Sequence, residues 1–420
     1  MTFNTNTQIV LFLYNLGIRV YYLAILITSP FNRKARLWVN GRKGLFEHIR
    51  SKLEPGISVI WFHCSSLGEF EQGRPVIEKI RDIFPGRKIL LTFYSPSGYE
   101  IRKNYSGADY IFYLPLDTRR NAAKFMNIVK PEAVFFIKYD YWFHFLSWLK
   151  KMNIKIYLIS GIFRPGQVFF KWYGKWFREI LRTFHHLFVQ DNKSAELLKS
   201  IGFENVTVCG DTRFDRVYEI GQKAAEFPLI LSFIDGKTVL IAGSTWPPDE
   251  DILIRFINEN KLPVKFIIAP HEIHERGIIR LKESIQRKTL RYTSINESEI
   301  KNAEVLIIDT IGILSSVYQY GSVAYIGGGF GKGIHNILEA AAFGLPIIFG
   351  PNFKKFHEAN ELIKLNGAFP IENFNDFIRI INTFINNHQT FTSAGDNARK
   401  YVQNNLGATS IITKFVRSYL

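Results

Sequence analysis

Cysteine is scarce in this sequence. Only Cys64 and Cys209 occur among 420 residues, and they stand far apart in the chain. So small a set argues against a disulfide framework and indicates a reducing compartment. No group of Cys and His residues has the spacing of a zinc site, and we expect no bound metal. Solenoid repeats and low-complexity tracts are also missing, so the sequence indicates an ordinary globular protein.

Positive charge, by contrast, is abundant. The chain has 53 Lys and Arg residues against 37 Asp and Glu residues, which gives a net charge of +16. A charge of this size favours a polyanionic partner, such as nucleic acid, an anionic membrane or a phosphorylated ligand. The length of 420 residues predicts two domains with a sizeable core.

Residues 9–27 form a nearly continuous apolar run, about as long as a bilayer-spanning helix. Asn15, Gly17 and Arg19 interrupt it, and a charge inside lipid is costly. We therefore expect residues 1–30 to be an embedded or interfacial membrane anchor rather than a clean span. The alternative is a buried first helix of the N-terminal domain. A signal peptide is not expected, because no basic stretch precedes the run and no small-residue cleavage site is present.

Two basic segments favour an anionic surface. The first directly follows the apolar run and is typical of the cytoplasmic, anionic leaflet of a membrane; it contains Arg33, Lys34, Arg36, Arg42 and Lys43. The second, residues 171–182, interleaves cations with aromatic residues in KWYGKWFREILR. That pattern suits a membrane face, a nucleic acid or a phosphorylated lipid, but it also suits an ordinary amphipathic helix.

Short apolar segments alternate with helical patterns through most of the chain, which indicates α/β domains with mainly parallel sheets. The expected strands of the first half are 57–62, 88–93, 110–113, 133–137, 154–159 and 186–189, with helices at 72–83, 119–129 and 194–201. The second half repeats the pattern at 238–242, 264–268, 305–308, 322–326 and 347–349, and ends in a helical segment from residue 373.

The sequence thus predicts two similar α/β halves facing a cleft. Residues 31–220 form the first Rossmann-like domain and residues 221–420 the second, with a linker at 219–235. Open parallel sheets bind ligands beyond the carboxyl ends of their strands. We therefore look for functional residues directly after the expected strands.

The richest such segment is 322–350, SVAYIGGGFGKGIHNILEAAAFGLPIIFG. It predicts a strand, a glycine turn, a helix over 334–343 and a further strand. Glycines let a ligand approach the bare backbone, and a helix N-terminus suits a phosphate. The turn is no P-loop, because Lys332 is followed by Gly333, and no register fits the GxGxxG dinucleotide motif.

Three polar residues follow the glycine turn. His335, Asn336 and Glu339 are expected to share a face just inside the helix N-terminus. A carboxylate placed there can accept both hydroxyls of a ribose. The alternative is a tight turn followed by a capped, solvated helix.

Glu69 is the first candidate for catalysis. It follows the opening strand of the first domain, after Gly68 in the segment HCSSLGEF. A glutamate can act as a general base when its surroundings raise its pKa. A carboxylate in the first turn of a helix can equally be a capping group, and both readings stay open from the residues alone.

The segment AGSTWP, residues 242–247, ends another strand in Gly-Ser-Thr. Ser244 and Thr245 could bind a nucleotide phosphate or cap the next helix. Asp249, Glu250 and Asp251 form a literal DxD, which holds a metal in some transferases. Here it opens a helix, where acidic residues are normal, so we expect no metal there.

The glycine-rich segment GGGFGKGIHNILEAAAFGLPIIFGP resembles the donor-nucleotide motif of the transferases of 3-deoxy-D-manno-octulosonic acid (Kdo), which have the two-domain B-type glycosyltransferase fold. HCSSLGE resembles the family's N-domain motif, in which the glutamate is the catalytic base. Further segments are similar as well: SPSG at 95–98, YLPLD at 113–117, GDTRFD at 210–215 and APHEIHER at 269–276. Two segments depart from the family pattern. In KYDYW at 138–142, Lys138 stands where the family usually has an acid, and Ser160-Gly161-Ile162 stands where it usually has Asn-Ala-Arg.

The resemblance implies transfer of Kdo from CMP-Kdo to a lipid A precursor, with inversion, on the cytoplasmic face of a bacterial inner membrane. It implies a C-terminal helix that returns to the first domain, and neither a cofactor nor a nucleic-acid partner. Glu69 would be the base. The donor residues would be Ser244, Thr245, Arg213, His271, Gly328, Gly329, Gly331, His335, Asn336 and Glu339. The acceptor residues would be Ser66, Ser95, Ser97 and Asp140.

Two other functions remain open. One is another B-type glycosyltransferase or a sugar-nucleotide epimerase with the same donor cleft. The other is a basic peripheral membrane or nucleic-acid-binding module without catalysis, against which Glu69 and the glycine turn both argue.

Overall fold

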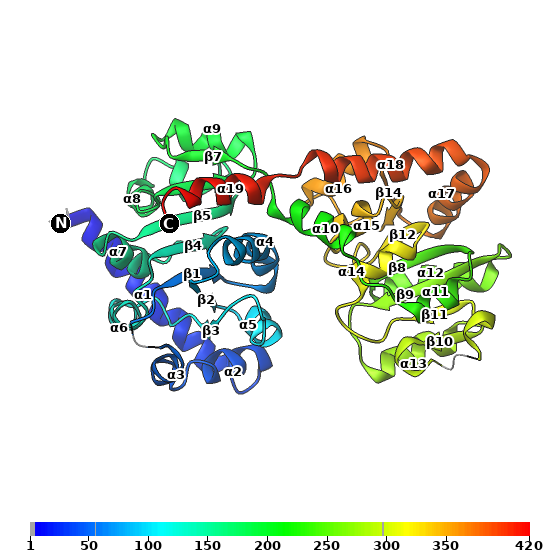
Figure 1. Cartoon of the computed structure of the whole chain (residues 1–420), viewed down its shortest axis with the longest axis horizontal. Helices are drawn as coiled ribbons and strands as arrows, with labels where there is room; N and C mark the ends of the chain where they lie inside the picture. Colours follow the sequence, from blue (N-terminus) through cyan, green and yellow to red (C-terminus); the bar gives the residue numbers. More distant parts are fainter. Residues whose placement is uncertain (1–4, 55, 296–297) are drawn as a thin grey trace. The chain divides into compact units, whose positions relative to one another are not determined.

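The computed structural model describes residues 5–54, 56–295 and 298–420. The chain divides into two compact units. Unit 1 comprises Met1–Asp215 and Gly407–Leu420, and unit 2 comprises Arg216–Leu406. Figure 1 shows a central sheet covered by helices in each unit.

Unit 1 is built on a seven-stranded parallel sheet in the order β3-β2-β1-β4-β5-β6-β7. The strands are β1 Val59–Cys64, β2 Lys88–Phe93, β3 Tyr110–Tyr113, β4 Ala133–Ile137, β5 Lys155–Gly161, β6 His186–Val189 and β7 Val206–Val208. Helices cover both faces, which explains why β1 and β4 are apolar and buried along their whole length. Four strands have the predicted bounds, whereas β7 was missed because its three residues are too short for a pattern.

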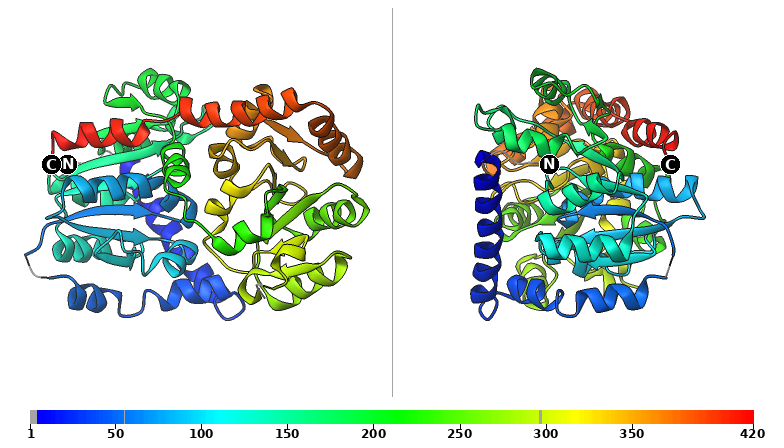
Figure 2. Two further views of the ribbon diagram at one scale, coloured as in Figure 1. Left: turned by 45° about the vertical axis from the view of Figure 1, so that its right-hand side comes forward. Right: turned by 90° about the vertical axis from the view of Figure 1, so that its left-hand side faces the viewer.

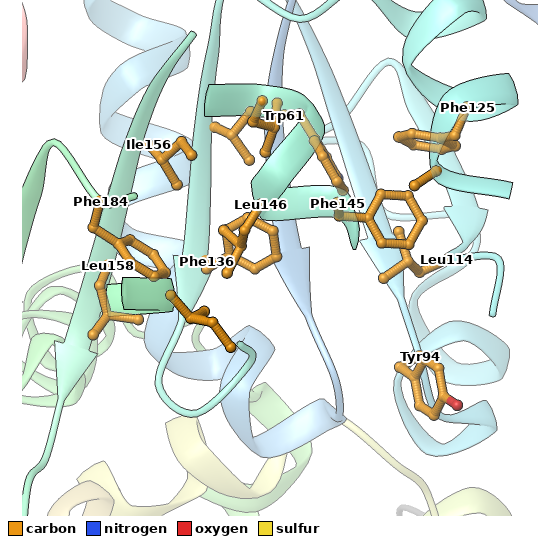
Figure 3. Packing of buried hydrophobic residues seen from close by; sticks show 14 of the residues in the cluster. Trp61, Tyr94, Leu114, Phe125, Phe136, Phe145, Leu146, Ile156, Leu158 and Phe184 are labelled. Atoms are coloured by element: carbon orange, nitrogen blue, oxygen red, sulfur yellow. The ribbon is translucent and has the colours of Figure 1, made fainter. Parts of the chain in front are cut away.

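The helices of unit 1 connect these strands. They are α1 Thr5–Thr28, α2 Arg33–Asn40, α3 Leu45–Lys52, α4 Leu67–Ile83, α5 Pro96–Arg102, α6 Arg119–Val129, α7 Phe143–Lys151, α8 Lys175–Leu181, α9 Asn192–Ser200 and the first part of α10 Thr212–Gln222. A short 3₁₀ turn, η1, spans Val168–Phe170. On one sheet face Trp61 packs against Phe125 of α6 and Phe145 of α7, with ring centroids 5.0 and 6.0 Å apart (Figure 3).

The last helix, α19 Ala408–Arg417, belongs to unit 1 and packs against α4 on the other sheet face. Ile412 and Val416 are fully buried there. The carboxylate of Asp215 accepts hydrogen bonds from the backbone N–H groups of Gly407 and Thr409, both at 2.7 Å. These bonds satisfy amides at the start of α19, so the last residue of GDTRFD holds the C-terminal helix.

Helix α1 is docked on unit 1 along one side. The Tyr14 hydroxyl donates to Asp117 at 2.5 Å, and Asn15 Oδ1 lies 2.7 Å from His144 Nε2. Val10, Leu11 and Ile25 are half-buried against the core. Asn15, which interrupts the apolar run, therefore faces the protein. Figure 2 shows α1 lying along the outside of unit 1.

The opposite side of α1 is apolar and exposed. We call it the outer face of α1; it consists of Ile9, Phe12, Leu13, Leu16, Val20, Leu23 and Ile27. Their spacing of three and four residues places them on one stripe of the helix. Among the described residues, Gln8–Thr28 is the one segment whose length and composition would allow it to cross a membrane.

Unit 2 repeats the architecture with a seven-stranded parallel sheet in the order β10-β11-β9-β8-β12-β13-β14. The strands are β8 Thr238–Thr245, β9 Val264–Pro270, β10 Thr289–Arg291, β11 Val305–Ile307, β12 Val323–Ile326, β13 Ile347–Phe349 and β14 Ala368–Pro370. The predicted α/β class with two parallel sheets is therefore confirmed. The edge strands β10 and β14 were missed, again because each has only three residues.

The remaining helices of unit 2 are α11 Pro228–Ile234, α12 Pro247–Glu259, α13 Glu275–Ser284, α14 Leu314–Val317, α15 Leu338–Ala342, α16 His357–Lys364, α17 Phe374–Asn386 and α18 His388–Asn404. Three 3₁₀ turns accompany them: η2 Tyr292–Ser294, η3 Ile300–Asn302 and η4 Tyr318–Tyr320. The linker expected at 219–235 is wrong. That segment forms the end of α10 and helix α11, whose Ile230 and Phe233 are fully buried.

Candidate functional site

Glu69 lies in the first turn of α4, just beyond the carboxyl end of β1. Its Oε2 accepts the backbone N–H of Ser66 at 3.0 Å, and the Ser66 hydroxyl accepts the N–H of Glu69 at 3.5 Å. This reciprocal capping box fixes the carboxylate in place. Burial raises the pKa of Glu69, although the amides of Ser65 and Ser66 and the charge of Lys138 oppose the shift.

A second carboxyl group lies in the same site. Asp140 follows β4 and is 8% exposed. The Ser65 hydroxyl donates to its Oδ1 and Oδ2 at 2.6 and 2.8 Å. Burial raises the pKa of Asp140 well above its usual range, and the negative charge of Glu69 adds to this rise. The strands β1 and β4 are neighbours in the sheet, which explains how residues 75 positions apart meet.

The turn after β2 borders this site. The backbone N–H of Ser95 donates to the carbonyl of Ser65 at 2.8 Å. The hydroxyls of Ser95 and Ser97 lie 3.0 Å apart, and Ser95 caps α5. The structure therefore brings Ser66, Ser95 and Asp140 together with Glu69 at the carboxyl edge of one sheet.

In unit 2, the glycine loop, residues 327–333, follows β12. The carboxylate of Asp249 is fully buried and holds this loop. Its Oδ2 accepts the N–H groups of Gly328 at 2.8 Å and Trp246 at 2.9 Å, and Tyr325 donates to its Oδ1 at 2.9 Å. The first acid of the literal DxD is therefore a structural anchor. No group of metal-ligating residues was found among the described residues.

Close backbone approach explains the glycines. A Cβ on Gly329 would lie 2.5 Å from the backbone nitrogen of Gly350, and Gly328 has a φ of 90°. Several loop amides bond internally: those of Gly331 and Gly333 both donate to the Gly328 carbonyl. Within the described part of the chain, the amides of Gly329, Phe330 and Lys332 have no such partner, so these three are the better candidates for an anion.

The helix predicted over 334–343 is wrong at its start, because α15 begins only at Leu338. Gly333 has a φ of 138°, and the His335 amide donates to the Gly327 carbonyl at 3.1 Å. Both features are incompatible with a helical backbone at residues 333–335. His335 and Asn336 therefore precede the helix, although the Asn336 amide group still donates to Glu339 at 3.0 Å.

An aromatic cluster of Trp246, His271 and His335 lies beside the glycine loop. The rings of His271 and His335 stack with centroids 4.2 Å apart, and those of Trp246 and His271 with centroids 4.8 Å apart. The Trp246 indole donates to His335 Nε2 at 3.0 Å. Burial lowers the pKa of His335 to about 4, so this imidazole is neutral near pH 7. Sequence reasoning missed Trp246, although it stands inside the AGSTWP segment.

Two predicted donor residues have other partners. The Thr245 hydroxyl is buried and donates to Glu250 at 3.2 Å. Arg213 lies in unit 1, where its guanidinium pairs with Asp211 at 2.7 Å. Ser244 adopts a left-handed backbone with a φ of 54° at the end of β8. Their roles toward a donor remain predictions.

The chain is similar in sequence to known proteins. Residues 39–216 match the family model of 3-deoxy-D-manno-octulosonic-acid transferases (kdotransferases). The 3-deoxy-D-manno-octulosonic acid transferase of Rickettsia prowazekii is 28% identical over 361 residues, covering 83% of this chain and 77% of that protein. The transferase of the same name from Aquifex aeolicus is 27% identical over 327 residues, covering 76% and 84%.

The fold also has solved counterparts. UDP-GlcNAc 2-epimerase from Neisseria meningitidis, bound to UDP-GlcNAc, aligns with a TM-score of 0.59 and 14% identity. The alignment covers 86% of this chain and all of that one. At this identity the likeness shows the fold alone. The sequence matches carry more weight: over most of its length the chain is similar to Kdo transferases, which indicates a glycosyltransferase.

Proposed function

We propose that this protein transfers Kdo from CMP-Kdo to the hydroxyl of a lipid A precursor, with Glu69 as the general base. The observation that carries the proposal is the position of Glu69 in a chain of this family. Its carboxylate is held by a capping box at the carboxyl end of β1, and its pKa is raised by burial. A carboxylate of this kind can take a proton from an attacking hydroxyl near neutral pH.

The donor half of the proposal uses unit 2. The amides of Gly329, Phe330 and Lys332 would bind the single phosphate of CMP, with the aromatic cluster offering a flat surface beside the loop. Asn336 and Glu339, already hydrogen-bonded to each other, would bind the ribose hydroxyls. Backbone donors of this type stabilise the charge of a departing phosphate. The proposal needs no metal or cofactor.

The acceptor half uses unit 1. Ser66 is hydrogen-bonded to Glu69, and Ser95 and Ser97 lie in the turn that borders this site; all three would contact the acceptor sugar. One oxygen nucleophile attacks the anomeric carbon, the bond to the CMP phosphate breaks, and CMP leaves. No enzyme nucleophile takes part, so a single displacement inverts the anomeric configuration.

We also propose that unit 1 sits on an anionic membrane through α1. Two polar residues of α1, Tyr14 and Asn15, are hydrogen-bonded to the rest of unit 1, and the outer face of the helix is apolar. A helix docked on one side and apolar on the other lies in the membrane interface rather than across the bilayer. Phe31, 92% exposed, and the cations that follow it would continue this surface.

Acidic substitutions on the outer face of α1 should release the protein from lipid. For Leu16→Glu combined with Leu23→Glu we expect at least a tenfold loss of binding, because each apolar side chain removed from lipid costs about 1.5–3 kcal/mol. Flotation with phosphatidylglycerol-containing vesicles measures this. The control is Ile311→Glu, which changes an exposed isoleucine of unit 2. Equal flotation of the double variant and the control would contradict the interfacial placement.

The function is tested by incubating the full chain with CMP-Kdo and a tetra-acylated lipid A precursor. We expect CMP to be released in step with formation of a glycolipid. A basic binding module without catalysis would instead bind RNA with a steep salt dependence and show no saturable CMP binding. That outcome would replace the proposed function.

A further inference from the structure

The site in unit 1 contains two carboxyl groups, which are hydrogen-bonded to two consecutive serines. Ser65 donates its hydroxyl to both oxygens of Asp140, and Ser66 donates its backbone N–H to Glu69. The charge of Glu69 raises the pKa of Asp140. Two carboxylates in such a site rarely ionise together, so one of them holds a proton.

The protonation state of His63 decides which of the two carboxyl groups, Asp140 or Glu69, holds the proton. His63 is fully buried at the end of β1, and burial lowers its pKa to about 3. The indole of Trp142 donates to His63 Nε2 at 3.2 Å. An indole N–H is only a donor, so Nε2 is an unprotonated acceptor. The imidazole proton therefore lies on Nδ1, 2.8 Å from the hydroxyl of Thr92.

Asp140 Oδ2 lies 3.3 Å from this same unprotonated Nε2. An ionised carboxylate this close to an unprotonated ring nitrogen would gain no hydrogen bond from it and would be repelled by it, whereas a neutral carboxylic acid would not be. We propose that Asp140 is a neutral carboxylic acid in the resting enzyme and that it keeps Glu69 as the ionised base. This extends the proposed role of Glu69 and rests on it.

The charges around the pair support this division. Asp140 faces Glu69 from α4 and His63 from β1; the hydroxyl and the backbone amide of Ser65 lower its pKa, but burial and the charge of Glu69 outweigh them, and no cation is among the groups that shift it. Glu69, by contrast, has the positive charge of Lys138 and two backbone amides, all of which favour its ionised form. The buried Cys64 is a neutral thiol, because burial raises its pKa well above the usual range. The pair therefore carries one negative charge, on Glu69.

Asp140 is thus a positioning residue. In the transfer step Glu69 takes the proton of the acceptor hydroxyl, while Asp140 keeps its own proton and its bonds to Ser65. Were Asp140 ionised, its charge would raise the pKa of Glu69 further and leave less of the base ionised at neutral pH.

Infrared spectroscopy of the full chain in detergent, titrated from about pH 5 to pH 9 in H₂O and D₂O, tests this assignment. We expect wild type to show, at pH 7, a carboxylic-acid carbonyl band that shifts in D₂O. Asp140→Asn should lose this band. Glu69→Gln should keep it and titrate it at lower pH, because the charge that raises the pKa of Asp140 has been removed.

The proposal is overturned if wild type lacks the band at pH 7, or if Glu69→Gln lacks it at every pH of the titration down to about pH 5, which would place the proton on Glu69. The spectrum of Glu69→Gln alone decides the matter should Asp140→Asn fail to fold. The band reports only the charge state of the pair, so its presence or absence is independent of whether the protein transfers Kdo. Loss of transfer, measured separately, tests the proposed function.

Discussion

Glu69→Gln is expected to lower the rate of Kdo transfer by about 10²–10⁴-fold, the range that a general base contributes. The amide keeps the shape of the side chain and can still accept the N–H of Ser66, so the start of α4 should persist. What it loses is the ability to take a proton. CMP release at saturating donor and acceptor measures the effect, with circular dichroism to check the fold.

The matched control is Glu71→Gln, two residues further along the same helix. Glu71 forms an ion pair with Arg102 at 2.7 Å, and its loss should change the rate by no more than about fivefold, because a surface pair contributes about 0–1 kcal/mol. Full turnover by Glu69→Gln would remove Glu69 from the mechanism.

The rate of the wild type should also depend on pH through Glu69. The base must be ionised, and its pKa is raised by burial. Activity should therefore fall as the pH drops through a value above the ordinary range of a glutamate. The acid limb should disappear in Glu69→Gln, where only residual turnover remains.

Gly329→Ala should abolish measurable CMP binding or weaken it by roughly 5–150-fold, the equivalent of about 1–3 kcal/mol for overpacking. The added Cβ would lie 2.5–2.8 Å from three backbone atoms of Gly350. Backbone on both sides leaves no side chain to move aside, so the loop or β13 must shift. Calorimetric titration with CMP measures the loss.

Gly331→Ala is the comparison within the same loop. Its Cβ would meet only the Gly328 carbonyl oxygen, at 3.6 Å, an ordinary contact. We expect a much smaller effect on CMP affinity than for Gly329→Ala. Equal affinities of the two variants would show that the close approach to Gly350 does not matter for the donor site.

The sheets were predictable because their strands are buried on both faces. Four strands of unit 1, including Lys88–Phe93 and Ala133–Ile137, have the bounds expected from their apolar runs. The start of α15 was not predictable, because a helical pattern continues back to Ile334. The hydrogen bond from His335 to Gly327 and the positive φ of Gly333 override it, and neither has a signature in the local sequence.

Parts of both sites depend on contacts between distant segments. Glu69 could be found from its place after a strand and a glycine, but the hydrogen bond from Trp142 to His63, beside Asp140, joins residues 79 positions apart. Asp249 was predicted to be an ordinary acidic residue in the first turn of a helix. It does bind the amide of Trp246, and it also holds Gly328, 79 residues further on. Only the folded sheet brings such pairs together.

The most direct test of the account is the structure of the reaction product. Mass spectrometry of the acceptor after incubation with CMP-Kdo should show the added mass of Kdo, and NMR should show an anomeric configuration opposite to that of the donor. Retained configuration would contradict the single displacement assisted by Glu69. An unchanged acceptor, with CMP released only by hydrolysis, would contradict the transfer itself.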